Sequence, residues 1–113
     1  MDDAPDSRRL EDEGYEPVCR LDDVPHHIPR RVEVGDRGLL ICREGDEVFA
    51  LDEMCPHRNQ SMQRAPVELG KITCPHHRFG FDLRTGRCDR RCAPVETFDA
   101  AVADGRVWVR VPS

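Results

Sequence analysis

The chain has 113 residues, a length that suits one domain, with a net charge of −5 and 35% charged residues. No apolar run reaches the roughly 18–20 residues that a membrane helix needs, and the opening MDDAPDSRRL lacks the apolar core of a secretory signal. We therefore expect a soluble cytoplasmic protein that binds no membrane and, given its acidity, no nucleic acid.

Charge is unevenly distributed along the chain. Residues 1–14 carry six acidic side chains and two arginines and show no apolar periodicity, which predicts a disordered acidic tail. Residues 58–91 carry eight basic and three acidic side chains, so the middle of the chain is basic. We assign residues 15–113 to a single folded domain.

From residue 15 onward, short apolar runs alternate with turn residues. The runs at 38–43 and 47–51 flank Gly45-Asp46, and Asp104-Gly105 separates the last two runs, so both pairs predict hairpins. No window shows a sustained helical period, which indicates an all-β fold, a small antiparallel sandwich or barrel. Strands are predicted at 15–20, 30–34, 38–43, 47–51, 71–74, 79–83, 98–102 and 106–111.

Two matched segments carry the chemistry: Cys-Pro-His at 55–57 and Cys-Pro-His-His at 74–77. Each follows a predicted strand, and each offers a thiolate and an imidazole beside a proline that stiffens the loop. Two cysteines and two histidines can bind one zinc ion or a [2Fe–2S] cluster. A zinc finger pairs cysteine with cysteine and places its histidines on a helix. Here each loop offers one cysteine and one histidine, which favours the [2Fe–2S] cluster. A zinc-held structural or interaction module is the alternative.

The spacing, Cys-x-His, 16 residues, then Cys-x-x-His, resembles that of the Rieske [2Fe–2S] family over nearly the whole chain. The resemblance implies a Rieske-like antiparallel β sandwich or barrel with a small cluster-binding subdomain formed by two loops. It implies that Cys55 and Cys74 hold the inner iron, and that His57 and His77 hold the outer iron. The Cys-x-x-His spacing favours His77 over its neighbour His76.

Neighbouring positions suggest a low reduction potential. High-potential members of the family have a disulfide between the loops and Ser and Tyr hydroxyls near the cluster sulfurs. This chain has Gln60 and His76 where those members have the disulfide cysteines, and Phe79 and Phe81 where they have the Ser and Tyr hydroxyls. Fewer donors to sulfur disfavour the reduced cluster, so we expect a value near the bottom of the range of about −150 to +300 mV. The chain also has Arg78 where the family usually has glycine, at a position where φ > 0 is costly for arginine.

The resemblance implies an electron carrier rather than an enzyme. No Gly-rich nucleotide fingerprint is present, and 113 residues leave no room for an oxygenase domain. We expect the ferredoxin component of an oxygenase system, which takes electrons from a flavin-dependent or other ferredoxin reductase and passes them to a terminal oxygenase. The alternatives are the small subunit of an assimilatory nitrite reductase, against which the complete ligand set counts, and a redox sensor.

Arginines should surround the proposed histidine ligands and speed docking on an acidic patch of the oxygenase. The alternative is that these arginines are paired or simply solvated. The arginines concerned are Arg58, Arg64, Arg78, Arg84 and Arg87.

The remaining cysteines and histidines receive no ligand role. Cys19 and Cys42 fall in predicted strands and are interpreted as buried thiols. Cys88 and Cys92 are interpreted as free thiols, with a disulfide or a second metal site as alternatives. The His-His pair at 26–27 is interpreted as loop histidines.

Overall fold

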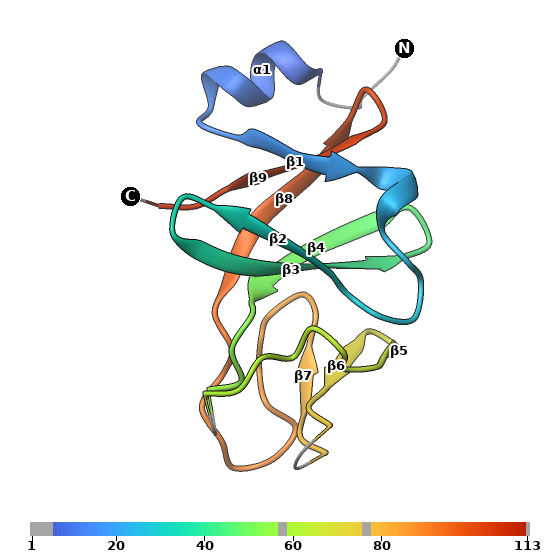
Figure 1. The fold of residues 1–113 in the computed structure, drawn as a ribbon, viewed down its shortest axis with the longest axis vertical. Coiled ribbons are helices and arrows are strands. Elements are labelled where there is room, and N and C mark those ends of the chain that lie inside the picture. The colour runs from blue at the N-terminus through green and yellow to red at the C-terminus, as the bar shows by residue number, and fades with distance from the viewer. Residues whose placement is uncertain (1–5, 57–58, 76–77, 113) are drawn as a thin grey trace.

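The computed structural model describes residues 6–56, 59–75 and 78–112 (Figure 1). One α-helix, α1 (Ser7–Asp12), and one short 3-10 helix, η1 (Leu21–Asp23), accompany the strands of this part of the chain. The strands are β1 (Glu16–Arg20), β2 (Arg30–Val34), β3 (Arg37–Glu44), β4 (Glu47–Asp52), β5 (Val67–Glu68), β6 (Lys71–Thr73), β7 (Gly80–Asp82), β8 (Thr97–Ala103) and β9 (Arg106–Arg110).

The strands form two antiparallel sheets, which confirms the all-β prediction. The large sheet has the order β1-β9-β8-β4-β3-β2, and its edge strands β1 and β2 lie side by side, so the sheet nearly closes on itself (Figure 1). The small sheet has the order β5-β6-β7 and forms the lower end of the molecule in Figure 1. Within the described ranges, no helix is long and apolar enough to cross a membrane.

Strand β3 is buried on both faces, and this connects the two sheets. Leu39 and Ile41 face the interior of the large sheet, whereas Leu40 and Cys42 face the small subdomain; all four are fully buried. Successive side chains of a strand point to opposite faces, so a strand between two cores has no polar side. This burial on both faces explains why the sequence is apolar without interruption from Leu39 to Cys42.

The small subdomain has its own core. Its buried members include Met62, Ile72 and Phe81, and it also contains Cys55 and Cys74. Leu40, Cys42 and Leu51 of the large sheet complete it. The segments that carry the two motifs are therefore held against the large sheet by one continuous apolar core.

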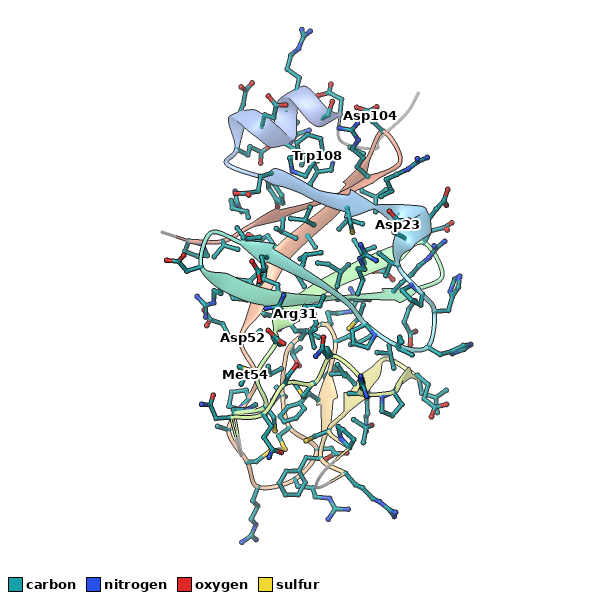
Figure 2. The ribbon with its side chains drawn as sticks, in the orientation of Figure 1. Asp23, Arg31, Asp52, Met54, Asp104 and Trp108 are labelled. Carbon is teal, nitrogen blue, oxygen red and sulfur yellow. A yellow bond between two sulfur atoms is a disulfide. The ribbon has the colours of Figure 1, made fainter. Side chains whose placement is uncertain are left out.

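The acidic N-terminal segment contains a helix, so the disorder expected for residues 1–14 is wrong for residues 7–12. The Asp6 side chain accepts a hydrogen bond from Arg9 N at 2.8 Å and caps the start of α1. Leu10, 4% exposed, packs against Ala103 and Trp108 of the β8–β9 hairpin. Figure 2 shows Trp108 directly beneath α1, which covers the end of the molecule opposite the small sheet.

The cysteines outside the two motifs differ from their sequence interpretation in part. Cys88 and Cys92 are joined by a disulfide, so the free-thiol interpretation is wrong and the disulfide alternative is confirmed. Cys42 is fully buried as expected, and burial raises the pKa of its thiol to about 12. Cys19 is only half-buried, and burial also raises the pKa of its thiol. The loop interpretation of the histidine pair at 26–27 is confirmed, since both side chains are exposed.

Candidate metal centre

The first motif lies in a loop that two backbone hydrogen bonds close. Cys55 N donates to the carbonyl of Gln60 at 2.7 Å, and Asn59 N donates to the carbonyl of Cys55 at 2.6 Å. Asn59 has φ = +54°, the left-handed conformation that lets the chain return toward its starting strand. The loop thus folds back on the cysteine itself.

The second motif lies in a loop closed in the same way. Cys74 N donates to the carbonyl of Phe79 at 2.9 Å, and Arg78 N donates to the carbonyl of Cys74 at 2.8 Å. Arg78 has φ = +59°, matching Asn59 at the same distance from its own cysteine. The first loop (residues 55–60) and the second loop (residues 74–79) therefore present their cysteines in equivalent backbone settings.

Both loop cysteines are completely buried in the core of the small subdomain. Each follows the end of a strand segment, Cys55 after the bridge between Met54 and Ser61, and Cys74 after β6. Two thiols from two loops in one water-excluded core suit a metal–sulfur group, because thiolates bind iron and zinc strongly. Cys42 shares this core, but it lies in strand β3, outside the two motif segments.

The proposed histidine ligands, His57 and His77, and the competing His76 lie outside the described residues. The structure therefore places the two cysteines of the predicted ligand set. The assignment of the two histidines rests on the sequence pattern.

The two phenylalanines beside the second loop are placed against the same core. Phe81 is fully buried within it, and Phe79 is half-buried and packs against it. Phenylalanine side chains offer no hydrogen-bond donor. Their positions agree with the low-potential prediction, which remains a prediction.

Arg78 adopts the positive φ that its position requires, so the second loop keeps its shape without a glycine. The cost of left-handed backbone for a non-glycine residue is on the order of 1 kcal/mol. The Arg78 side chain is exposed. Arg78 thus takes the positive φ that is costly for arginine, and its side chain points to solvent.

The segment after β7 forms a tight turn that packs against the chain returning to the core at Val95. Asp82 Oδ1 accepts hydrogen bonds from Thr85 N at 3.0 Å and Arg84 N at 2.8 Å, and these bonds lower the pKa of the Asp82 carboxyl. Gly86 has φ = +77°, and a Cβ there would lie 2.1 Å from the carbonyl oxygen of Val95. A side chain at this glycine would displace the chain that returns to the core.

The arginines of the basic segment fall into two groups. Arg84 pairs with Glu47 of β4 at 3.2 Å and lies over the Phe49 ring, so for this arginine the alternative of an internal ion pair is confirmed. Five exposed arginines of this segment have no carboxylate partner among the described residues. Arg90 lies over the Phe79 ring, and the other four are Arg64, Arg78, Arg87 and Arg91. Arg58 lies outside the described residues.

Comparison with known proteins agrees with this geometry. A model of the Rieske [2Fe-2S] domain family matches residues 14–101. The chain belongs to this family. The Rieske chain is 30% identical to the anthranilate 1,2-dioxygenase ferredoxin subunit of Burkholderia cepacia, over 86% of its own length and 92% of the relative's. It is 33% identical to the 3-phenylpropionate/cinnamic acid dioxygenase ferredoxin subunit of Photorhabdus laumondii, over 83% and 91% of the two chains.

Solved structures show the same relationship. The Sphingomonas yanoikuyae B1 ferredoxin superposes with a TM-score of 0.78 at 27% identity, covering 86% of this chain and 98% of that one. A putative nitrite reductase small subunit has a TM-score of 0.77 at 20% identity, a likeness of fold alone. This Rieske protein is an electron carrier that holds one [2Fe–2S] cluster, rather than a catalytic enzyme.

One feature of the Rieske site escaped the sequence interpretation. Asn59 and Arg78 close their loops in the same conformation, yet only Arg78 was singled out, because the family pattern has glycine there. Superposing the two Cys-Pro segments on each other would have found the match, since both residues stand four positions after their cysteine.

Proposed function

We propose that this protein is the ferredoxin component of a Rieske-type oxygenase system. It accepts one electron from a flavin-dependent or other ferredoxin reductase in the cytoplasm and delivers it to a terminal oxygenase. The observation that carries the proposal is the pair of buried cysteines, Cys55 and Cys74, whose backbone groups make equivalent hydrogen bonds to the residues four and five positions later. The oxygenase as partner is supported by a related structure, a complex of reduced oxygenase and oxidised ferredoxin in carbazole 1,9a-dioxygenase, 29% identical to this chain.

In this proposal, Cys55 and Cys74 bind the buried iron and His57 and His77 bind the outer iron. The bound cluster supplies a centre that takes up and releases a single electron. The residues of this chain exclude water around the sulfurs, because both cysteines and Phe81 are inaccessible to solvent. Phenylalanine in place of hydroxyl donors keeps the potential at the low end of the Rieske range.

Four exposed arginines of the basic segment, which have no carboxylate partner among the described residues, form the proposed docking surface; they are Arg64, Arg78, Arg87 and Arg91. Cations left free of internal ion pairs can meet carboxylates on an oxygenase and raise the rate of encounter. This attraction weakens as salt is added, because exposed charges are screened within about 8–10 Å at 0.1–0.15 M ionic strength.

The cluster is tested by the visible and EPR spectra of the purified protein before and after dithionite. A coloured, EPR-silent oxidised form and a reduced signal with the low average g of His-ligated clusters are expected. Cys55→Ser and Cys74→Ser should each abolish the colour, whereas the matched variant Cys42→Ala, in the same core, should keep it. A colourless wild-type protein that contains zinc would overturn the carrier function.

The histidine assignment is tested with a second pair of variants. His77→Ala should lose the Rieske-type EPR signal, and His76→Ala should keep it. If the two variants behave in the opposite way, the second motif binds through His76.

The docking surface is tested by electron transfer to an oxygenase at increasing salt. Arg64→Gln with Arg87→Gln should slow the reaction at low salt and flatten its salt dependence. Arg106 is a matched control, because it is exposed, has no carboxylate partner among the described residues, and begins β9 at the opposite end of the molecule. Arg106→Gln should leave the salt dependence unchanged.

A further inference from the structure

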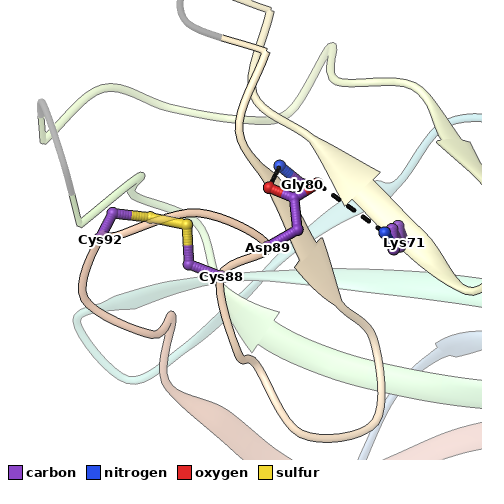
Figure 3. The surroundings of a disulfide bond; sticks show 5 residues. All are labelled: Lys71, Gly80, Cys88, Asp89 and Cys92. Atoms are coloured by element: carbon purple, nitrogen blue, oxygen red, sulfur yellow. Dashed lines mark hydrogen bonds and ion pairs between the residues drawn. A yellow bond between two sulfur atoms is a disulfide. The ribbon is translucent and has the colours of Figure 1, made fainter.

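A disulfide lies beside the metal centre without being part of it. Cys88 and Cys92 are four residues apart, with Cα atoms 5.8 Å from each other, and both pack against the core that contains Cys55 and Cys74 (Figure 3). Both are half-buried, so one side of the pair is in contact with solvent. The bridge closes a small loop, residues 88–92, which we call the disulfide loop.

The Cys88 side of the disulfide loop is fixed by contacts that do not need the bridge. Asp89 N donates to the carbonyl of Gly80 at 2.8 Å, and Asp89 Oδ1 accepts from Gly80 N at 3.0 Å. The other Asp89 oxygen lies 3.8 Å from Lys71 Nζ. Figure 3 marks this ion pair with a dashed line. Asp89 can come this close because residue 80 is glycine: a Cβ there would lie 2.7 Å from Asp89 Oδ2. Cys88 therefore stays against β7 whether or not the disulfide is present.

The Cys92 side depends on the disulfide. From Arg90 to Pro94, the only backbone hydrogen bond in this described stretch is local, from Cys92 N to the carbonyl of Arg90 at 3.0 Å. The chain rejoins the core at Val95, whose N–H donates to Gly86 O at 2.9 Å. The disulfide is thus the bond that holds this stretch against the subdomain core.

The surroundings of the pair favour thiol chemistry. Arg87, Arg90 and Arg91 flank the two cysteines and are exposed, and positive charge stabilises a thiolate once the bridge is opened. A thiolate with a lowered pKa is also a better leaving group in thiol–disulfide exchange. An accessible disulfide in a cationic setting has the features of an exchangeable bond rather than of a buried structural one.

We propose that Cys88–Cys92 is a second redox site, which exchanges two electrons with a protein dithiol of the Cys-x-x-Cys type. A thiolate of the partner attacks one sulfur, the Cys88–Cys92 bond breaks, and a mixed disulfide forms. The second partner thiol resolves it. The partner leaves as a disulfide, and Cys88 and Cys92 become two thiols after gaining two electrons and two protons. The exchange goes beyond the one-electron carrier function, because the cluster takes no part in it.

Reduction has a structural consequence at the cluster end. The Arg90 guanidinium lies 5.7 Å from the centre of the Phe79 ring, and Phe79 supplies the carbonyl that closes the second loop. Release of residues 90–94 therefore frees the segment that covers Phe79, while the Asp89 contacts keep Cys88 in place. The oxidised and reduced forms then present different surfaces beside the second loop.

The test is thiol labelling of the cluster-loaded protein in mixtures of reduced and oxidised dithiothreitol, with the visible spectrum recorded to verify that the cluster is intact. Maleimide labels mapped to peptides should rise from none to two per chain on Cys88 and Cys92 as the reduced fraction increases. Cys19, a half-buried free thiol, serves as the internal reference and should label equally throughout. Failure of the pair to label in excess reduced dithiothreitol, or complete labelling before any reductant is added, would overturn the proposal.

Limited proteolysis provides the second measurement. Trypsin cleavage after Arg90 and Arg91 should accelerate on reduction by on the order of tenfold, because a short covalent loop is opened. A Cys88→Ser/Cys92→Ser double variant should be cleaved at the fast rate with or without reductant. Equal cleavage rates for the oxidised and reduced wild-type protein would contradict the release of residues 90–94. Neither readout depends on electron transfer to an oxygenase, so these results are independent of the proposed function.

Discussion

Arg31 Nε lies 2.9 Å from Glu53 Oε1, which joins the edge strand β2 to the residue that leads from β4 into the first loop. The second carboxylate oxygen of Glu53 accepts a hydrogen bond from Ser61 Oγ at 2.6 Å, on the far side of that loop. The Glu53 side chain is only 12% exposed. One carboxylate thus fixes the first loop relative to the large sheet.

Replacing this carboxylate should destabilise the protein. We expect Glu53→Ala to lower the free energy of unfolding by roughly 1–3 kcal/mol, because Ser61 loses its acceptor in a poorly solvated place. Glu33, the other partner of Arg31, is a matched control with a side chain 63% exposed. Glu33→Ala should change the stability by less than about 0.5 kcal/mol. Chemical denaturation of both variants measures the difference, and equal losses would assign the effect to the Arg31 charge alone.

The Asp82 turn predicts a pH-dependent contribution to stability. Hydrogen bonds from Thr85 N and Arg84 N lower the pKa of Asp82 below its ordinary value of 3.8. A carboxyl with a lowered native pKa stabilises the fold above its ordinary pKa, and this stabilisation is lost as the pH falls through the native pKa. Asp82→Asn keeps an acceptor and removes the charge, so it should lower stability by roughly 0.5–1 kcal/mol near neutral pH.

The measurement is thermal unfolding of the wild type and Asp82→Asn from neutral to acidic pH. The two curves should converge below pH 3.8. A gap between wild type and Asp82→Asn that stays constant with pH would show that the carboxylate charge contributes nothing.

Asn59 stands at the position of the first loop that corresponds to Arg78, so asparagine is a natural replacement for this arginine. Arg78→Asn should raise the free energy of unfolding by about 0.5–1 kcal/mol, because asparagine tolerates a φ near +59° better than arginine. It should also weaken the salt dependence of electron transfer, because one cation of the docking surface is lost. Arg106→Asn, at a strand position without positive φ, should show neither change. A stability loss in Arg78→Asn would mean that the arginine side chain itself supports the loop.

Helix α1 should contribute to stability without affecting the metal centre. Leu10→Ala removes a nearly buried side chain from its contact with Trp108 and should cost about 2 kcal/mol, the low end for such truncations, because the helix lies at the surface. Glu11→Ala, on the exposed side of the same helix, should cost less than about 0.5 kcal/mol. The visible spectrum of both variants should match that of the wild type. An altered spectrum in Leu10→Ala would show that the two ends of the molecule are coupled.

Local patterns made much of the fold predictable. The strand at 30–34 has the predicted bounds, and the turn at Gly45-Asp46 joins β3 to β4 as expected. The pair of Cys-Pro segments at a defined spacing predicts Cys55 and Cys74 as ligands, and the structure places both in one buried core. Such features depend on residues close together in the sequence, which is why sequence alone suffices for them.

Contacts between distant residues account for what the sequence did not reveal. Leu10 is a lone apolar residue in an acidic stretch, and its helix is stabilised by Trp108 near the other end of the chain. The Cys88–Cys92 bridge lies beside a contact between Asp89 and Gly80, residues nine positions apart, which the local sequence pattern does not predict. Strand β5 was missed because two residues carry too little periodicity to register.

The position of the metal centre at one end of the molecule determines how the carrier must work. The molecule is 43 Å long and 21 Å across its shortest axis, with the two loop cysteines in the small subdomain and α1 over the opposite end. Under the proposed function, the reductase and the oxygenase both exchange electrons with a cluster at this end, so we expect them to dock on the same face in turn. Each partner must dissociate before the other can bind. Tight binding to either partner would slow electron transfer to the other. A large excess of reductase should therefore inhibit turnover by occupying the face that the oxygenase needs.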